Sequence, residues 1–407
     1  MNRTLKTACC IAGGGPAGIM LGLLLARTGV EVIVCEKHGD FLRDFRGDTI
    51  HPSTLELMYE LGLLEEFLKR PHQEVRELGG QIGDEFILLA DFSHLPTRCR
   101  FLALMPQWDF LDFIAQHAAR YPTFSLRMNS QIVELLHNNG QIVGVIANEA
   151  EGPIEIRSDL VVGADGRHSV VREKAELASR SFGAPMDVLW FRVPRLPTDG
   201  EQTLGSINDG RMMVSINRDD YWQCAYLIRK GDYPQIKQRG LPLFKNDVAS
   251  IAPFLSDRLS ALNDWNDIKL LTVLVDRLQK WYRPGLLCIG DAAHAMSPIG
   301  GVGINLAIQD AVAAANILSS RLLRESVTAV DLERVQLRRE LPTRITQGVQ
   351  VFIQNQLIKR ILGKRGKLSL PWPLKLFRRF PLLRRIPARL VGLGFRPEHI
   401  RPRNTAL

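Results

Sequence analysis

The first forty residues contain two kinds of apolar segment. Residues 7–12 and 31–35 are short apolar runs, which is typical of buried strands. Residues 16–28 lie between them and are rich in Ala, Leu and Met, which favours a helix. Strand, glycine-rich turn, helix and strand within about 30 residues predict a β-α-β unit with a parallel sheet.

The middle of the chain predicts a mixture of helices and strands. Apolar positions have helical spacing in residues 53–69 and 108–120, and residues 72–105 between them favour strands. Residues 186–230 alternate apolar and polar positions, with many β-branched and aromatic side chains, which predicts antiparallel strands. Further strands are expected at 131–136, 142–148, 153–157, 159–163 and 286–289, and a long helix at 304–323.

This order of elements predicts an α/β protein with an α+β second domain. We expect a Rossmann-like nucleotide-binding domain, a mixed β-sheet substrate domain interleaved with it, and a basic helical C-terminal region. The expected boundaries are 1–70, 108–175 and 281–330 for the first domain, 71–107 and 176–280 for the second, and 331–407 for the C-terminal region.

Composition is that of an ordinary globular protein. Of the 407 residues, 45% are hydrophobic and 23% are charged, which allows a sizeable core. No apolar run is expected to reach the ~18 residues of a membrane-spanning helix, and the glycines at 13–18 argue against a secretory signal at the start. The cysteines show neither C-x-x-C nor zinc-site spacing, which predicts reduced, buried thiols in a cytoplasmic protein: Cys9, Cys10, Cys35, Cys99, Cys224 and Cys288.

The net charge of +9 is concentrated at one end. Residues 334–407 contain 18 Lys and Arg and two acidic residues, whereas the rest of the chain has a net charge of −7. We therefore expect no binding of nucleic acid by the protein as a whole. Residues 359–403 interleave basic pairs with Leu, Phe, Trp and Pro. This segment either makes peripheral contact with the inner face of an anionic membrane or caps the domain with solvated arginines.

The turn after the first strand carries the first candidate motif. Residues 13–18 fit the pattern G-x-G-x-x-G as Gly13, Gly15 and Gly18. In a dinucleotide site these glycines permit a tight turn, close approach of a pyrophosphate and close helix–strand packing, and the helix N-terminus favours the phosphates. Glu36 ends the second strand, where a carboxylate accepts both ribose hydroxyl protons. The alternative is a glycine turn that merely packs a helix.

Two later segments place glycine and aspartate after a predicted strand. Residues 163–166 read Gly-Ala-Asp-Gly, and alone they also fit an ordinary turn in which Asp165 caps the next helix. In residues 290–305, Asp291 suits a sugar or ribityl hydroxyl, and the proline and glycines let backbone lie against a flat ring. The helix beginning near Ile304 would favour electron density on a reduced, anionic ring.

With these three motifs in order and at comparable spacing, the chain resembles the class A flavoprotein monooxygenases, FAD-dependent oxidoreductases similar to para-hydroxybenzoate hydroxylase. The resemblance covers roughly residues 7–330. It implies non-covalent FAD and no metal, with Pro298, Gly301 and Gly303 against the flavin ring. The complete set of implied FAD contacts is Gly13, Gly15, Pro16, Ala17, Gly18, Glu36, Lys37, Arg46, Gln107, Asp165, Gly166, Gly290, Asp291, Pro298, Gly301, Gly303, Ile304 and Asn305.

The resemblance also implies a mechanism in which the cofactor carries the chemistry. NAD(P)H reduces the flavin, O2 then forms a C4a-hydroperoxide, and oxygen passes to an aromatic, quinone-like or polycyclic small molecule. No protein nucleophile is expected, so catalytic side chains stay unassigned. We interpret His294 as a cofactor-loop residue, and His51 and His168 as solvent or packing residues.

Absent motifs narrow the choice of family. The chain has no second Rossmann motif, no C-x-x-x-x-C and no W-x-W-x-I-P, the mark of flavin-dependent halogenases. Several large side chains of the second domain belong to a substrate pocket or, as we prefer, to core packing: Trp190, Phe191, Met212, Met213, Tyr221, Trp222, Tyr226 and Arg277.

Two alternative functions stay open. The first is a flavoenzyme of the same fold that reduces or epoxidises a lipid such as an isoprenoid. The second is a flavin-bound protein that acts by binding without turnover. Glu36 does not distinguish NADH from NADPH, because it addresses the FAD ribose.

Overall fold

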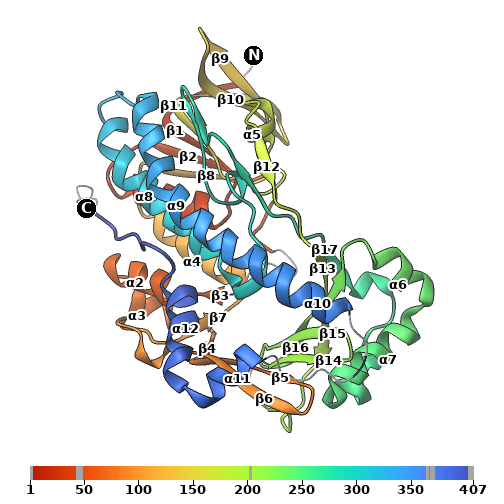
Figure 1. Ribbon diagram of the computed structural model, residues 1–407. Helices are drawn as coiled ribbons and strands as arrows, with labels where there is room; N and C mark the ends of the chain where they lie inside the picture. Colours follow the sequence, from red (N-terminus) through yellow and green to blue (C-terminus); the bar gives the residue numbers. More distant parts are fainter. Residues whose placement is uncertain (1–2, 43–48, 201–203, 364–365, 367–371, 402–407) are drawn as a thin grey trace.

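The larger sheet is built around five parallel strands (Figure 1). The computed structural model describes residues 3–42, 49–200, 204–363, 366 and 372–401. The strand order is β19-β20-β11-β1-β2-β8, and the edge strand β19 is antiparallel to β20. The bounds are β1 (Arg3–Ala12), β2 (Val32–Cys35), β8 (Phe124–Arg127), β11 (Gly152–Gly163), β19 (Tyr282–Arg283) and β20 (Leu286–Cys288).

Helix α1 (Pro16–Ala26) packs against this sheet and is apolar all round. Every residue from Ala17 to Ala26 is buried, because α4 (Gln107–Ala118) and α8 (Gly303–Leu322) pack against it. By length and composition, residues 299–322 are apolar enough to cross a membrane, but most of this segment (72%) is buried inside the protein. The expectation that no segment reaches spanning length therefore fails for α8, although its burial marks it as a core helix.

A meander extends the same sheet. β9 (Gln131–Asn138) and β10 (Gln141–Glu149) pair antiparallel with each other, and β10 pairs with the first half of β11. The strands predicted separately at 153–157 and 159–163 form one continuous strand, because β1 pairs with β11 along most of its length.

The second main sheet has seven strands in the order β17-β13-β16-β15-β14-β5-β6, and β14 is parallel to β5. Its two faces pack against different elements. On β13, Leu189 and Phe191 join α7 and η2 in one apolar cluster, whereas Val188 and Trp190 contact a cluster that includes Ile299. The bounds are β5 (Glu77–Ile82), β6 (Glu85–Asp91), β13 (Met186–Pro194), β14 (Leu204–Asn208), β15 (Arg211–Asn217), β16 (Tyr221–Arg229), β17 (Lys269–Leu271), α6 (Tyr233–Arg239), α7 (Leu241–Ile251), η2 (Pro253–Ala261) and η3 (Trp265–Asp267).

Smaller elements join the two sheets. The predicted helix at 53–69 is broken into α2 and α3, because Gly62 adopts a left-handed conformation (φ +74°) that ends the first helix. β3 pairs with β7, which also pairs with β4, and β12 pairs with β18. The bounds are β3 (Thr49–Ile50), β4 (Gln73–Val75), β7 (Leu102–Leu104), β12 (Ser179–Ser181), β18 (Asp276–Leu278), α2 (Pro52–Glu60), α3 (Leu64–Phe67), α5 (Val170–Lys174), η1 (Phe92–His94), η4 (Gly290–Ala292) and η5 (Ile299–Gly301).

The C-terminal region is helical. In Figure 1, α9 runs from beside the larger sheet toward the second one, and shorter helices follow it: α9 (Ala329–Ile353), η6 (Gln354–Ile358), α10 (Lys359–Gly363), α11 (Trp372–Arg379), η7 (Pro381–Arg384) and α12 (Arg385–Gly392). The predicted fold class is confirmed by similarity to solved structures, whereas the domain boundaries stay a prediction. All six cysteines are buried free thiols.

Candidate functional site

The three glycine-rich segments meet at one edge of the larger sheet. The last residues of β1 and β11, Ala12 and Gly163, are paired, and Gly163 is paired with Cys288 of β20. Ala164 N donates to Ala12 O (2.8 Å), and Ile289 N donates to Gly163 O (2.9 Å). The carboxyl ends of neighbouring parallel strands are where α/β folds bind nucleotides. The sheet register thus brings together motifs that are separated by more than a hundred residues in the sequence.

Each glycine of the first motif has its own steric reason. Gly13 has φ +98°, and a Cβ there would lie 2.6 Å from Ala164 O. A Cβ on Gly18 would lie 1.9 Å from Gly13 O. By contrast, nothing lies within 4 Å of a Cβ built on Gly15. Gly15 is the N-cap of α1, and no side chain caps that helix end. This open cradle at a helix N-terminus fits a pyrophosphate.

Glu36 is oriented by backbone donors at the end of β2. Gly14 N donates to Oε2 (2.9 Å) and His38 N donates to Oε1 (3.1 Å). The carboxylate is buried, and a carboxylate oxygen can accept from more than one donor. Lys37 beside it is exposed. Arg46 lies outside the described residues, and Gln107 is the first residue of α4, which packs against α1.

Asp165 accepts one hydrogen bond from the first turn of α5 and keeps its second carboxylate oxygen free. Its Oδ2 accepts from Val171 N (3.2 Å) in α5, and its Oδ1 is buried without a hydrogen-bond partner. Burial raises the pKa of Asp165, although hydrogen bonds from Ser169 and from the α5 backbone oppose that shift. The N-cap residue of α5 is Ser169, whose hydroxyl accepts from Arg172 N (2.9 Å), so Asp165 supports the first turn from outside the helix. Oδ1 fits a hydroxyl donor. Gly166 follows with φ +87°.

The third segment is fixed by close packing and by hydrogen bonds of the Asn305 side-chain amide. A Cβ on Gly290 would lie 3.1 Å from the Cβ atoms of both Ala17 and Ala307, so η4 fits tightly between α1 and α8. Asp291 beside it is exposed. Asn305 Oδ1 accepts from His51 N (2.9 Å) and from Thr54 Oγ1 (2.7 Å).

The same amide group of Asn305 also holds the loop that is expected to lie against the flavin ring. Asn305 Nδ2 donates to Thr49 O (3.1 Å) and to Gly301 O (3.4 Å). Gly301 has φ +61°, and a Cβ there would lie 2.8 Å from Thr49 Oγ1. Pro298 precedes η5, whereas Gly303 and Ile304 begin α8. Asn305 is thus fully engaged with protein atoms and positions the loop.

A buried ionic network behind this segment was missed by the sequence analysis. Asp310 Oδ2 accepts from Gly290 N (3.1 Å) and lies 2.6 Å from His294 Nε2, while Arg339 Nε donates to Oδ1 (2.9 Å). Arg339 also pairs with Glu398. Burial alone would raise the pKa of Asp310, but His294 and Arg339 outweigh it and the pKa is lowered. The one sequence signal was a carboxylate inside an apolar helix.

Glutamines of α9 hold the same segment from another side. Gln350 accepts from Ser297 N (3.2 Å) and donates to Ser297 O (3.0 Å) and Ile299 O (2.8 Å). Gln347 donates to the carbonyls of Asp276 and Ala295. Because both glutamines are buried, they satisfy backbone groups that water does not reach. α9 therefore fixes the loop on both sides of Pro298.

Most of the large side chains expected on the substrate side are core residues. Phe191, Met213, Trp222 and Tyr226 belong to the cluster under α7 and η2. Trp190 and Met212 contact the other cluster, which includes Ile299 of the loop. Tyr221 packs against Arg192, and Arg277 donates to Gln347 Oε1 (2.8 Å). Within the described ranges, no group of three or more His, Cys, Asp or Glu side chains is placed to hold a metal ion.

Comparisons with known proteins agree with this geometry. Residues 6–341 match the family model of the FAD binding domain. The chain is 30% identical over 386 residues to 6-methylpretetramide 4-monooxygenase of Streptomyces rimosus, covering 94% of this chain and 92% of that protein. It is 29% identical over 316 residues to the uncharacterized aromatic compound monooxygenase YhjG of Bacillus subtilis, covering 76% of this chain and 60% of that protein. The fold is similar to p-nitrophenol 4-monooxygenase PnpA of Pseudomonas putida (TM-score 0.74, 20% identity, 97% of this chain and 100% of that chain).

Fold and site together define a flavin-dependent oxidoreductase. The chain belongs to the FAD binding domain family, within the class A flavoprotein monooxygenases, and its cofactor is FAD.

Proposed function

We propose that the protein is an NAD(P)H-consuming monooxygenase that hydroxylates an aromatic, quinone-like or polycyclic small molecule. Two observations together carry the proposal. Three glycine-rich segments converge at one sheet edge. The loop that follows the third segment packs, at Ile299, against an apolar cluster that includes Val188 and Leu227 of the second sheet. A flavin held by the edge would therefore face that sheet.

Residues at the sheet edge would hold the FAD from end to end. Gly15 and the N-terminus of α1 receive the pyrophosphate, because the cradle is open there. Glu36 accepts the ribose hydroxyls, and Asp165 Oδ1 and Asp291 accept hydroxyls nearer the ring. When bound, FAD supplies the redox chemistry, taking hydride from NAD(P)H and delivering oxygen from O2 to the substrate.

The chain's own residues position the reactants and exclude water. Gln350 and Asn305 fix the loop from Ser297 to Gly301, so the ring-lining backbone is preorganised. Trp190, Met212 and Leu271 contact the apolar cluster on the sheet face toward that loop. Such a wall suits a flat apolar substrate.

The substrate class is supported by what the relatives act on. The Streptomyces rimosus relative is named for 6-methylpretetramide, and the Pseudomonas putida structure for p-nitrophenol. Reduction or epoxidation of a lipid is the competing reaction, and oxygen consumption separates hydroxylation from reduction.

The test uses the purified FAD-loaded chain under air, with NADH and NADPH supplied separately. Oxidation of one nicotinamide is expected to accelerate with 6-methylpretetramide or a related polycyclic phenol, with matching O2 uptake. A Trp190→Ala variant should raise the KM for that substrate, whereas Trp222→Phe, a change behind the sheet, should leave KM near the wild-type value. Substrate reduction without O2 uptake would contradict the proposal.

A further inference from the structure

Helix α9 buries mainly polar residues and exposes several large apolar ones. Its buried residues are largely polar, and their polar groups hydrogen-bond within the protein: Asp331, Gln336, Arg339, Thr343, Gln347 and Gln350. Its outer surface carries large apolar side chains beside the charged residues Glu333, Arg334 and Arg344, since Val330, Leu337, Leu341 and Phe352 are 56%, 64%, 56% and 66% exposed. A helix that merely covers a globular core shows the reverse pattern.

The exposed residues form one stripe. They are separated by seven, four and eleven positions, which correspond to about two, one and three turns of a helix. Single exposed apolar residues need no explanation, but a continuous stripe of large ones marks an interaction surface.

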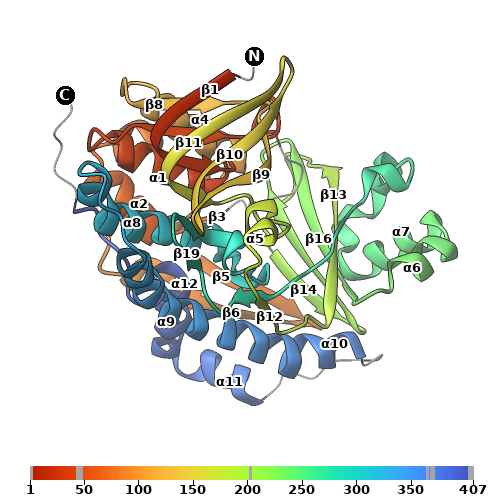
Figure 2. The same cartoon turned by 90° about the horizontal axis from the view of Figure 1, so that it is seen from above.

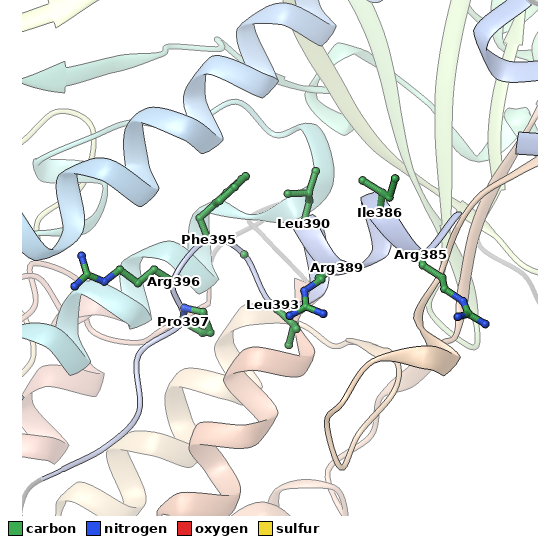
Figure 3. Close-up of a pocket in the computed structure, with 9 residues that line it drawn as sticks. Arg385, Ile386, Arg389, Leu390, Leu393, Phe395, Arg396 and Pro397 are labelled. Carbon is green, nitrogen blue, oxygen red and sulfur yellow. The ribbon is translucent and has the colours of Figure 1, made fainter. Parts of the chain in front are cut away.

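A second group of exposed apolar residues follows on α11, η7 and α12. Leu376, Phe380, Leu382 and Ile386 are all exposed. Beside them, Ile386, Leu390 and Phe395 point to the same side of the chain (Figure 3) and line a groove of about 520 Å³. Arg385, Arg389 and Arg396 also line the groove. The lining of the groove therefore combines apolar and basic side chains.

The helices that carry the two groups lie close together (Figures 1 and 2). Both views place α9, α11 and α12 together, away from the end of the second sheet that carries α6 and α7 (Figures 1 and 2). We call this surface the basic apolar face. It consists of Leu337, Leu341, Phe352, Leu376, Phe380, Leu382, Ile386, Lys375, Arg379 and Arg389.

Charge identifies what covers this face. Residues 372–392 contain six Lys and Arg and no Asp or Glu. Arg378 pairs with Glu85 of β6 (2.6 Å), whereas the side chains of Lys375, Arg379 and Arg389 are exposed. A symmetric dimer formed through this face would bring like charges against one another. Anionic lipid headgroups instead neutralise the cations while the apolar side chains enter the interface.

We propose that the basic apolar face docks the protein peripherally on an anionic lipid membrane. α9 contributes the apolar stripe, and the segment formed by α11, η7 and α12 contributes the cations together with four more apolar side chains. Docking through the outer surface leaves α8 in the core, so no helix has to insert. The surface extends to Leu337, upstream of the segment 359–403 indicated by charge and composition alone.

The test is flotation of the full-length FAD-loaded chain with two kinds of vesicle, phosphatidylcholine alone and phosphatidylcholine mixed with phosphatidylglycerol. We expect flotation with the mixed vesicles at low salt, and weaker flotation at high salt. Arg379→Gln/Arg389→Gln should weaken binding about fivefold for each charge removed. Leu337→Gln/Leu341→Gln/Phe352→Gln should weaken it at least on the order of a hundredfold, because three exposed apolar side chains no longer enter the interface.

Matched controls lie on the far side of the molecule. Leu243→Gln on α7 and Lys237→Gln on α6 remove an exposed apolar residue and an exposed cation, and both variants should float like the wild type. Failure of the wild type to float at low salt would overturn the proposal, as would wild-type binding by both face variants. Sedimentation equilibrium supplies a second readout. A monomer supports membrane docking, whereas a dimer that the Leu337→Gln/Leu341→Gln/Phe352→Gln variant dissociates would overturn it. None of these outcomes depends on the substrate or on turnover.

Discussion

His294 Nε2 lies 2.6 Å from Asp310 Oδ2, and both side chains are buried. The same carboxylate accepts from Gly290 N (3.1 Å) and from Arg339 Nε (2.9 Å). One residue of α8 therefore links the loop that carries Asp291 to helix α9. A buried carboxylate with three partners stabilises the fold only while all three are present.

Replacing this carboxylate should destabilise the protein strongly. In Asp310→Asn, Arg339 loses one of its two buried carboxylate partners and keeps only Glu398, which is expected to cost on the order of 3 kcal/mol. Urea unfolding of the FAD-loaded protein measures the loss. Glu134→Gln breaks the exposed pair with Lys174 (2.7 Å) and should leave the midpoint near that of the wild type. Equal effects of the two variants would argue against a buried network.

Asp310 also gives stability a defined dependence on pH. Its pKa is lowered in the folded protein, so the ionised form stabilises the fold above the unfolded-state pKa of about 3.9. That contribution is lost as pH falls through the lower folded-state pKa. The Asp310→Asn variant should therefore lose less stability than the wild type on acidification below about pH 4.

The burial of His51 predicts that the folding stability also falls at less acidic pH than for Asp310. Its ring is buried with Nδ1 2.6 Å from Val391 O, and burial lowers its pKa from 6.5 to about 4, although the carbonyls of Val391 and Gly300 oppose the shift. Folding thus favours the neutral ring. This stability is present above pH 6.5 and is lost between pH 6.5 and about 4, on the order of 3 kcal/mol in all.

The experiment compares unfolding free energies across that window. His51→Asn removes the titrating ring and should flatten the dependence, whereas His168→Asn, at an exposed site, should not. An unchanged slope in His51→Asn would show that another group is responsible.

Two glycines of the first motif should respond differently to the same substitution. Gly15→Ala adds a methyl group where no protein atom lies within 4 Å, so the apoprotein should fold normally. FAD should bind on the order of tenfold to hundredfold more weakly, because the methyl group occupies the pyrophosphate space.

Two other glycine-to-alanine variants serve as controls, one at a crowded position and one at an open position outside the motif. Gly18→Ala places a Cβ 1.9 Å from Gly13 O and should destabilise even the apoprotein. Gly348→Ala on α9, also without neighbours within 4 Å, should keep full FAD affinity. Wild-type FAD affinity in Gly15→Ala would place the pyrophosphate elsewhere.

Gln350 should position the ring-lining loop. Gln350→Ala leaves Ser297 and Ile299 without their buried partner, which is expected to cost about 1–3 kcal/mol. The loop should also become less well ordered, so that more hydrogen peroxide is released per NAD(P)H oxidised. Gln356→Ala changes an exposed glutamine of the adjoining helical turn and should do neither. Normal coupling in Gln350→Ala would limit its role to stability.

The nucleotide-binding half could be predicted from the sequence because its signals are local. Glycine spacing, the apolar run of α1 and Glu36 at the end of β2 all lie within one β-α-β unit. Register alone then brought Asp165 and Asp291 to the same edge.

The rest depends on contacts between distant segments. Asp310 and Arg339 are far apart in the sequence, and nothing local shows that they meet. Polar positions on α9 resemble a solvated face until the fold shows Gln347 and Gln350 buried against the loop. Gly62 could be read in the sequence as a possible end of the predicted helix. A single glycine, however, does not reveal whether a helix ends or is only less stable there.

Transfer of oxygen from O2 is the central claim, and isotope labelling tests it most directly. The FAD-loaded chain is supplied with NADH or NADPH, 18O2 and a polycyclic phenol such as 6-methylpretetramide, and the product is analysed by mass spectrometry. The account predicts one 18O atom in the hydroxylated product, with one O2 consumed per coupled turnover. A product reduced without O2 uptake, or one whose new oxygen comes from water, would contradict it.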